Sequence, residues 1–167
     1  GFPLRVSGII RDVTAMAEAE ASLRLRERAL ASSSCGVVIS DMRLPGQPIL
    51  YVNQAFEDIT GYSAVEVIGR NCSLLQGAEG SEQDAVREIR QAIATGRSCK
   101  VVLRNFRKNG EAFWNELQLS PLTDEHGVVT HFIGIQNDIT ANIAATKALV
   151  ESEQRLALTI DALHEGV

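Results

Sequence analysis

Residues 98–139 read SCKVVLRNFRKNGEAFWNELQLSPLTDEHGVVTHFIGIQNDI, three long stretches rich in β-branched, aromatic and other apolar residues with two turn signals between them. We expect strands at about 98–107, 111–122 and 128–139. Asn109-Gly110 is a strong signal for a tight hairpin, because both residues adopt positive φ angles at low cost. Residues 124–127 (DEHG) supply the second turn. The segment therefore predicts a three-stranded antiparallel meander.

The preceding segment adds a hairpin and several helices. Two short apolar stretches, 36–42 and 48–53, flank a turn-rich pentapeptide and predict two further strands. Residues 54–68 form short helical pieces that glycines interrupt, whereas 82–95 form a longer helix with one apolar face. Gly96 follows, where a glycine that ends a helix belongs. This order predicts an α+β fold, a five-stranded antiparallel sheet with helices gathered on one face.

Composition limits the class of protein. The chain has 167 residues, 45% of them hydrophobic, and a formal net charge of −5, which argues against a nucleic-acid surface. No apolar run approaches the roughly 20 residues that a membrane span requires. The three cysteines lack the spacing of metal ligands and are an odd number, so we expect reduced thiols in a cytoplasmic protein and no metal site. We also expect no membrane contact in this segment.

The two ends of the chain resemble each other. Residues 8–15 read GIIRDVTA and residues 134–141 read GIQNDITA, an offset of 126 positions. Such a repeat indicates tandem modules. We expect five parts: the end of a preceding module (1–14), an N-terminal linker helix (15–33), a complete core (34–140), a C-terminal linker helix (141–164) and the start of a following module (165–167).

Both linkers carry leucines or methionine every seventh residue, at Met16, Leu23 and Leu30 and at Leu149, Leu156 and Leu163. A seven-residue apolar period favours a coiled coil. We therefore expect a homodimer formed through the linker helices. The pattern is equally compatible with an amphipathic helix that packs on its own domain.

Three carboxamide residues fall on the three successive C-terminal strands, at Asn105, Asn115 and Gln136. If they share one face of the sheet, they form an uncharged polar strip in an apolar pocket. Such a strip suits the amide-like edge of a flat heterocyclic ring, although a single asparagine is more often a turn or edge residue. Apolar side chains available to sandwich the ring are Val38, Phe56, Leu75, Ile93, Leu117 and Leu119.

Residues 69–77 read GRNCSLLQG, which resembles the signature GRNCRFLQG of the light-oxygen-voltage (LOV) family, a flavin-binding branch of the PAS superfamily. Similar residues recur in the same order along about 36–140, in the stretches 43–45, 53–56, 61–62, 105, 109–110, 113–115 and 132–136. The resemblance implies a PAS-like fold.

The resemblance also implies a function. The chain is identified as a blue-light photosensory domain that binds a flavin, with FMN expected, and whose Cys72 thiol adds reversibly to the flavin ring. Gln136 matches the family residue that faces the ring. We expect it to pass the signal through Asp138 and Thr140 to the C-terminal linker helix. Asn71, Gln76 and Arg90 are the remaining residues that the resemblance assigns to cofactor binding.

The sequence departs from the family pattern at Ser73, where relatives carry an arginine that grips the flavin phosphate. Arg90 matches a second phosphate-binding arginine, and Arg87, one turn earlier, is a candidate replacement for the first. The loss of one charge-assisted contact predicts weaker FMN binding or tolerance of riboflavin or FAD. The loop from Gly77 to Asp84 is also one residue longer than usual.

Three classes of function compete. The leading one is a sensor domain without enzymatic activity, joined covalently to further sensor and output domains, the latter a histidine kinase or a diguanylate cyclase or phosphodiesterase. The second is a PAS module that dimerises or senses a ligand without photochemistry. The third is a flavoenzyme that uses Cys72 for redox catalysis, against which stands the lack of a dinucleotide glycine motif and of an acid–base pair around that residue.

Overall fold

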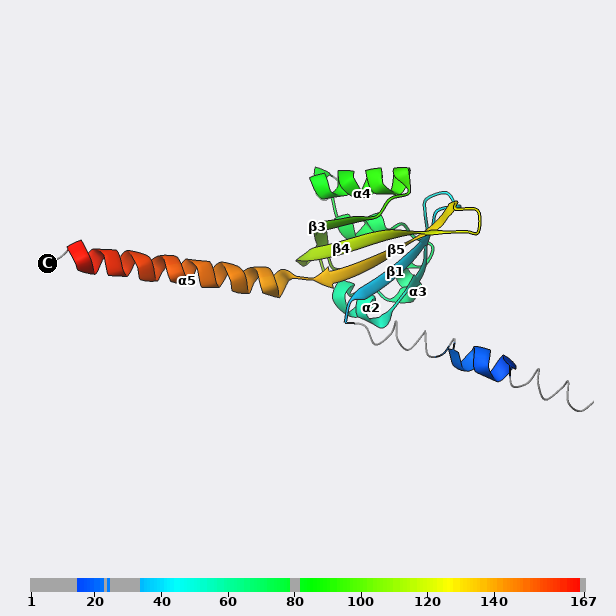
Figure 1. Ribbon diagram of the computed structural model, residues 1–167, viewed down its shortest axis with the longest axis horizontal. Helices are drawn as coiled ribbons and strands as arrows, with labels where there is room; N and C mark the ends of the chain where they lie inside the picture. Colours follow the sequence, from blue (N-terminus) through cyan, green and yellow to red (C-terminus); the bar gives the residue numbers. More distant parts are fainter. Residues whose placement is uncertain (1–14, 23, 25–33, 79–81, 166–167) are drawn as a thin grey trace, which may run out of the picture.

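The computed structural model describes residues 15–22, 24, 34–78 and 82–165. Its centre is a five-stranded antiparallel sheet in the order β2-β1-β5-β4-β3 (Figure 1). The strands are β1 (Gly36–Asp41), β2 (Ile49–Val52), β3 (Cys99–Phe106), β4 (Ala112–Thr123) and β5 (Val129–Asp138). The helices from α2 onward are α2 (Gln54–Thr60), α3 (Ala64–Val67), the 3-10 helix η1 (Cys72–Gln76), α4 (Asp84–Thr95) and α5 (Thr140–Glu165), and residues 15–22 are also helical.

The predicted α+β fold is confirmed, and each predicted strand ends within one residue of the observed position. The register brings the three carboxamide residues to one face of the sheet. Leu103 of β3 pairs with Asn115 of β4, and Leu117 of β4 pairs with Gln136 of β5. Because side chains alternate along a strand, the buried positions of β3, β4 and β5 all face the same side.

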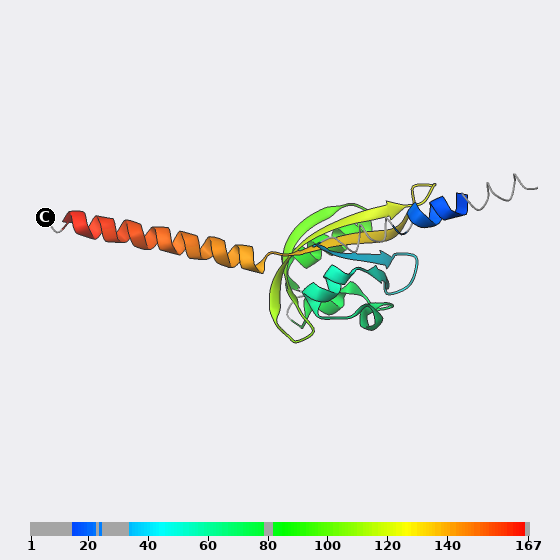
Figure 2. The same ribbon diagram turned by 90° about the horizontal axis from the view of Figure 1, so that it is seen from below.

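The short helices lie on one side of the sheet, where Figure 2 shows α2 and α3 beneath the curved strands. Asn53 caps α2 by accepting a hydrogen bond from the Phe56 amide, and Gly61 ends that helix with a φ of 74°. Gly96 ends α4 with a φ of 62°, as predicted, because a residue with a Cβ is strained in this conformation. The breaks between the helices therefore follow from local sequence.

Two apolar clusters hold the helices to the sheet. The first joins β1 and β2 to α2, α3 and η1 and contains Val38, Ile49, Val52, Phe56, Val67 and Leu75. The second joins α4 to β3 and contains Val86, Val101 and Leu103. The space between these clusters is where the pocket described below lies.

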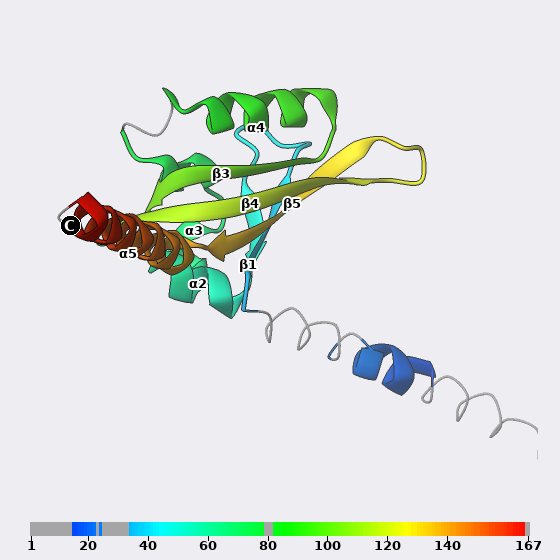
Figure 3. The same cartoon turned by 60° about the vertical axis from the view of Figure 1, so that its left-hand side comes forward.

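Helix α5 extends away from the sheet (Figure 1), and Figure 3 views this helix nearly along its axis. Leu149 and Leu156 are each 60% exposed and Leu163 is 69% exposed, so this row of leucines has no partner within the described residues. None of the described helices is long and apolar enough to cross a membrane. The expected end of a preceding module, residues 25–33 of the N-terminal linker, and residues 166 and 167 lie outside the described residues.

Candidate ligand-binding site

A cavity of about 350 Å³ lies between the sheet, η1 and α4. It gathers nearly all the residues that the sequence singled out as cofactor-binding: Val38, Asn71, Cys72, Leu75, Gln76, Arg90, Ile93, Asn105, Asn115, Leu117, Leu119 and Gln136. A volume of this size is typical of a site for a small organic molecule.

Phe56 is not among the residues that line this cavity. It is 1% exposed and packs in the first apolar cluster with Val38 and Leu75, so it supports the pocket wall from behind. The expectation that Phe56 sandwiches a ligand does not hold, because the rotation of α2 turns this side chain into the core.

Sequence reasoning missed seven residues that line the cavity: Ser40, Met42, Gln47, Ile89, Leu103, Phe132 and Gly134. Four of them could have been found from strand periodicity. Ser40 lies two residues after Val38, Leu103 two residues before Asn105, and Phe132 and Gly134 four and two residues before Gln136. Each therefore shares a sheet face with a residue already proposed.

Cys72 is the first residue of η1 and faces the cavity half-buried. Asn71 fixes the start of this helix: its Oδ1 accepts the Ser73 amide at 2.9 Å, and its Nδ2 donates to the Gly46 carbonyl at 2.6 Å. Burial raises the pKa of the Cys72 thiol, and a hydrogen bond with Ser40 partly opposes this rise. The thiol is therefore neutral at neutral pH.

The polar strip consists of Asn105, Asn115 and Gln136, all buried. Asn115 Nδ2 donates to Asn105 Oδ1 at 2.9 Å, and Asn105 Nδ2 donates to the Arg104 carbonyl at 3.3 Å. Asn115 Oδ1 and Gln136 Oε1 are buried without a hydrogen-bond partner among the described residues. An unsatisfied buried acceptor costs about 1–3 kcal/mol, so these atoms fit a ligand whose edge presents N–H donors.

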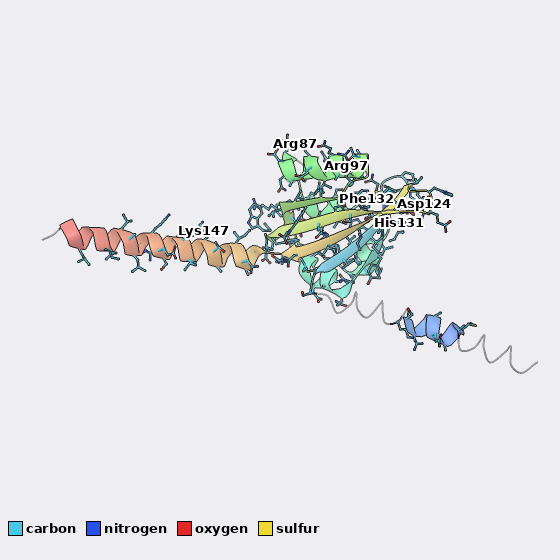
Figure 4. All side chains as sticks on the ribbon, viewed as in Figure 1. Arg87, Arg97, Asp124, His131, Phe132 and Lys147 are labelled. Carbon is cyan, nitrogen blue, oxygen red and sulfur yellow. The ribbon has the colours of Figure 1, made fainter. Side chains whose placement is uncertain are left out.

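The two arginines of α4 differ in position. Arg90 lines the cavity, whereas Arg87 pairs with Asp84 on the exposed side of the helix, where Figure 4 labels it. Arg87 is therefore not brought to the cavity as a replacement for the arginine that Ser73 displaces. Ser73 itself lines the cavity with an uncharged hydroxyl.

A polar network connects the end of β5 to α5. Asp138 Oδ1 accepts the Thr140 amide at 3.0 Å, and Thr140 Oγ1 accepts the Trp114 amide at 2.9 Å. Asp138 Oδ2 accepts a hydrogen bond from Arg107 at 2.5 Å, and the same guanidinium contacts the Ile59 carbonyl at the end of α2. Arg107 was not foreseen from the sequence, yet it joins α2 to the residues that precede α5.

Burial by itself would raise the pKa of Asp138, but its hydrogen bonds with Thr140 and Arg107 outweigh that effect and leave the pKa below its ordinary value. The carboxylate is therefore charged at neutral pH and holds this junction together.

The other two cysteines, Cys35 and Cys99, are not among the residues that line the cavity. In the part of the chain that the structure describes, no group of three or more His, Cys, Asp or Glu side chains could hold a metal ion.

Comparison with known proteins agrees with this geometry. The PAS domain family matches residues 34–141. The bacterioopsin transcriptional activator of Halobacterium salinarum is 43% identical over 145 residues, which cover 87% of this chain and 21% of that protein. A blue-light photoreceptor of Listeria monocytogenes is 39% identical over 144 residues, which cover 84% of this chain and 56% of that protein.

A solved LOV domain, from a blue-light-activated histidine kinase of Erythrobacter litoralis, is 39% identical. The match has a TM-score of 0.60 and covers 64% of this chain and 96% of that domain. The chain therefore belongs to the PAS domain family, in its LOV branch. It is a sensor domain, and it spans between about a fifth and just over half of the length of the two curated relatives above.

Proposed function

We propose that this domain senses blue light by binding a flavin in the cavity and forming a reversible bond between Cys72 and the flavin ring. The observation that carries the proposal is the pairing of a neutral thiol with two unsatisfied buried acceptors in one cavity. The unsatisfied acceptors cost free energy in an empty core, and a bound flavin would offer them a hydrogen-bond donor beside the thiol.

The polar strip would orient the ring. Asn115 Oδ1 and Gln136 Oε1 require N–H donors, and an oxidised flavin edge would supply one of them without net charge and a second when its other ring nitrogen takes up a proton. Val38, Leu117 and Leu119 provide the apolar walls on which a flat ring packs. The carboxamides therefore set orientation, and the apolar residues supply most of the contact area.

Cys72 would supply the reversible bond. When bound, the flavin contributes blue-light absorption and a ring carbon that accepts a nucleophile after excitation. Because excitation itself activates the ring, the thiol need not be deprotonated beforehand, and the raised pKa of Cys72 is compatible with this role. The requirement on the protein is to hold the sulfur at the cavity wall, which the cap that Asn71 forms on η1 achieves.

FMN is the proposed flavin, held at its phosphate by Arg90. With Ser73 uncharged and Arg87 turned toward Asp84, a single arginine would contact the phosphate. With one arginine, the FMN phosphate forms fewer charge-assisted hydrogen bonds than it would with two. Riboflavin and FAD therefore remain competitors for the site.

The signal would leave through Gln136, which lies two residues before Asp138 on β5 and must re-pair its amide when the flavin edge gains a proton. From Asp138 the change would reach Thr140, the first residue of α5.

We propose that α5 pairs with the same helix of a second copy in the cytoplasm. The helix pair would then drive an output domain, such as a kinase, that is joined to this domain.

The first experiment is spectroscopic. Purified protein should be yellow, with an absorption band that bleaches under blue light and recovers in darkness. Cys72→Ala should keep the flavin and its fluorescence but lose the bleaching. Cys99→Ala is the matched control, because Cys99 is half-buried outside the cavity, and it should behave as wild type.

The outcomes separate the candidate functions. A colourless protein would favour a PAS module that does not use flavin. Bleaching that requires an added reductant would favour a redox enzyme, and a normal light cycle in Cys72→Ala would contradict the role of this cysteine.

A further inference from the structure

A buried serine on the sheet contacts the sulfur of Cys72. Ser40 Oγ lies 3.5 Å from Cys72 Sγ, within hydrogen-bond distance for sulfur. Ser40 belongs to β1 and is 7% exposed, and both side chains line the cavity. The contact therefore ties the first turn of η1 to the sheet at the wall where a ligand would lie.

We propose that Ser40 is a positioning residue for Cys72, whose hydroxyl donates a hydrogen bond to Sγ, holds the sulfur at the cavity wall and stabilises negative charge that develops on it. The kinetic part of this proposal rests on the light-driven bond proposed above. The contact itself does not depend on that chemistry.

Either group could donate in this contact. We take the hydroxyl as the donor because a thiol is a weak one. With the Ser40 O–H directed at sulfur, the thiol hydrogen stays free to point into the cavity. The bond becomes stronger as the sulfur loses its proton, because hydrogen bonds to charged acceptors are about twice as strong as neutral ones. In agreement, burial raises the pKa of Cys72 and Ser40 acts against that rise.

This arrangement would act on the return reaction. In the forward direction the thiol would add as a whole across a carbon–nitrogen double bond of a bound flavin, with sulfur bonding to carbon and its hydrogen passing to nitrogen. In the reverse direction the carbon–sulfur bond would break, sulfur would keep the electron pair, and the proton would return to it from nitrogen. No further reactant is needed. Negative charge would grow on sulfur as that bond breaks, so the Ser40 hydroxyl should accelerate recovery in darkness.

The test uses three variants of Ser40 in the intact, flavin-loaded protein. Ser40→Ala removes the hydroxyl, while Ser40→Thr and Ser40→Val have nearly the same shape and differ in whether a hydroxyl is present. Ser120→Ala is the matched control, because Ser120 lies on β4 and is not among the cavity-lining residues. If the alanine variant folds poorly, the threonine–valine pair carries the comparison.

Two quantities are measured. The S–H stretching band of Cys72 is obtained in darkness by subtracting the infrared spectrum of the Cys72→Ala protein carrying the same Ser40 residue. Recovery after a blue flash is followed by absorbance. We expect Ser40→Ala and Ser40→Val to shift the band and to slow recovery roughly three- to tenfold, which corresponds to a barrier higher by about 0.7–1.4 kcal/mol. Ser40→Thr and Ser120→Ala should remain close to wild type.

The proposal is overturned if the S–H band of Ser40→Val coincides with that of Ser40→Thr, or if the two variants recover at the same rate. A band that shifts as expected in a protein that never bleaches would support the Ser40 contact and would sink the light-sensing function instead. The two proposals therefore fail in different ways.

Discussion

Gly36 on β1 lies directly opposite Gln136 on β5, and the backbone of α2 passes over it. A Cβ on Gly36 would lie 3.1 Å from the Phe56 Cα and 3.5 Å from the Gln136 Cβ. The preceding residue, Cys35, accepts a hydrogen bond from Asn53 Nδ2 at 3.1 Å through its carbonyl. The start of the core, α2 and the proposed relay glutamine thus meet at one point.

Gly36→Ala should destabilise the domain, because the added methyl group meets backbone atoms of α2 that cannot move independently. Overpacking of this kind costs about 1–3 kcal/mol. Chemical denaturation should show a lower midpoint. An unchanged midpoint would mean that α2 yields at no cost, contrary to the tight fit described here.

Gln136→Leu should leave the bleaching cycle largely intact and weaken the response of α5. Leucine fills a similar space but cannot form hydrogen bonds, so a change at the flavin edge would no longer be transmitted. Hydrogen exchange of α5 in darkness and in light measures the response. Gln118→Leu on the exposed side of β4 is the control and should respond like wild type. Equal responses in all three proteins would refute the relay.

Arg107→Met should weaken the junction between the sheet and α5. The substitution removes the hydrogen bond to Asp138 and the contact with the Ile59 carbonyl, while the methionine still packs near Phe113, whose ring centre lies 4.6 Å from the guanidinium carbon. We expect a loss of about 1–3 kcal/mol in the free energy of unfolding and faster exchange at the start of α5.

The control for this substitution is Arg104→Met, since Arg104 is exposed and its guanidinium carbon lies 5.4 Å from the centre of the Phe106 ring. Equal effects of the two substitutions would show that Arg107 has no special role at the junction.

Asp41 predicts a dependence of stability on pH. Its side chain is 5% exposed and pairs with Arg43 at 2.7 Å, and this hydrogen bond lowers the pKa of Asp41 from 3.8 to about 2. A carboxyl with a lowered pKa in the folded state stabilises the fold above its ordinary pKa, and the effect is lost as pH falls toward the folded value. Wild type should therefore melt above Asp41→Asn at pH 6, and the difference should shrink between pH 4 and pH 2. A difference that stays constant over this range would contradict the assignment.

Arg90→Gln should change which flavin co-purifies with the protein. Removal of Arg90, the one arginine that lines the cavity among the described residues, would deprive a phosphate of its charge-assisted contact, so the ratio of FMN to riboflavin should fall on the order of tenfold. Chromatography of the released flavin measures this ratio. Arg87→Gln should leave it unchanged, since Arg87 pairs with Asp84. A fall of equal size in both variants would show that Arg87 also reaches the phosphate.

Strand boundaries, helix ends and most of the cavity wall could be predicted from the sequence, because each depends on local properties. Side chains alternate with a period of two, so carboxamides on consecutive strands fell on one face once the strands were correctly bounded. Gly61 and Gly96 ended helices because a positive φ angle favours a residue without a Cβ. The motif around Cys72 then placed the thiol at that face.

Only the tertiary structure decided which distant residues touch. Phe56 entered the core instead of the cavity because the rotation of a helix depends on what packs against it. Ser40 contacts Cys72, which lies 32 residues later in the sequence, and Arg107 contacts Asp138, which lies 31 residues later. Strand register and helix packing together bring these side chains together in space. Sequence patterns specify which face of an element is apolar, whereas contacts between elements depend on the relative position of the elements, which no local pattern contains.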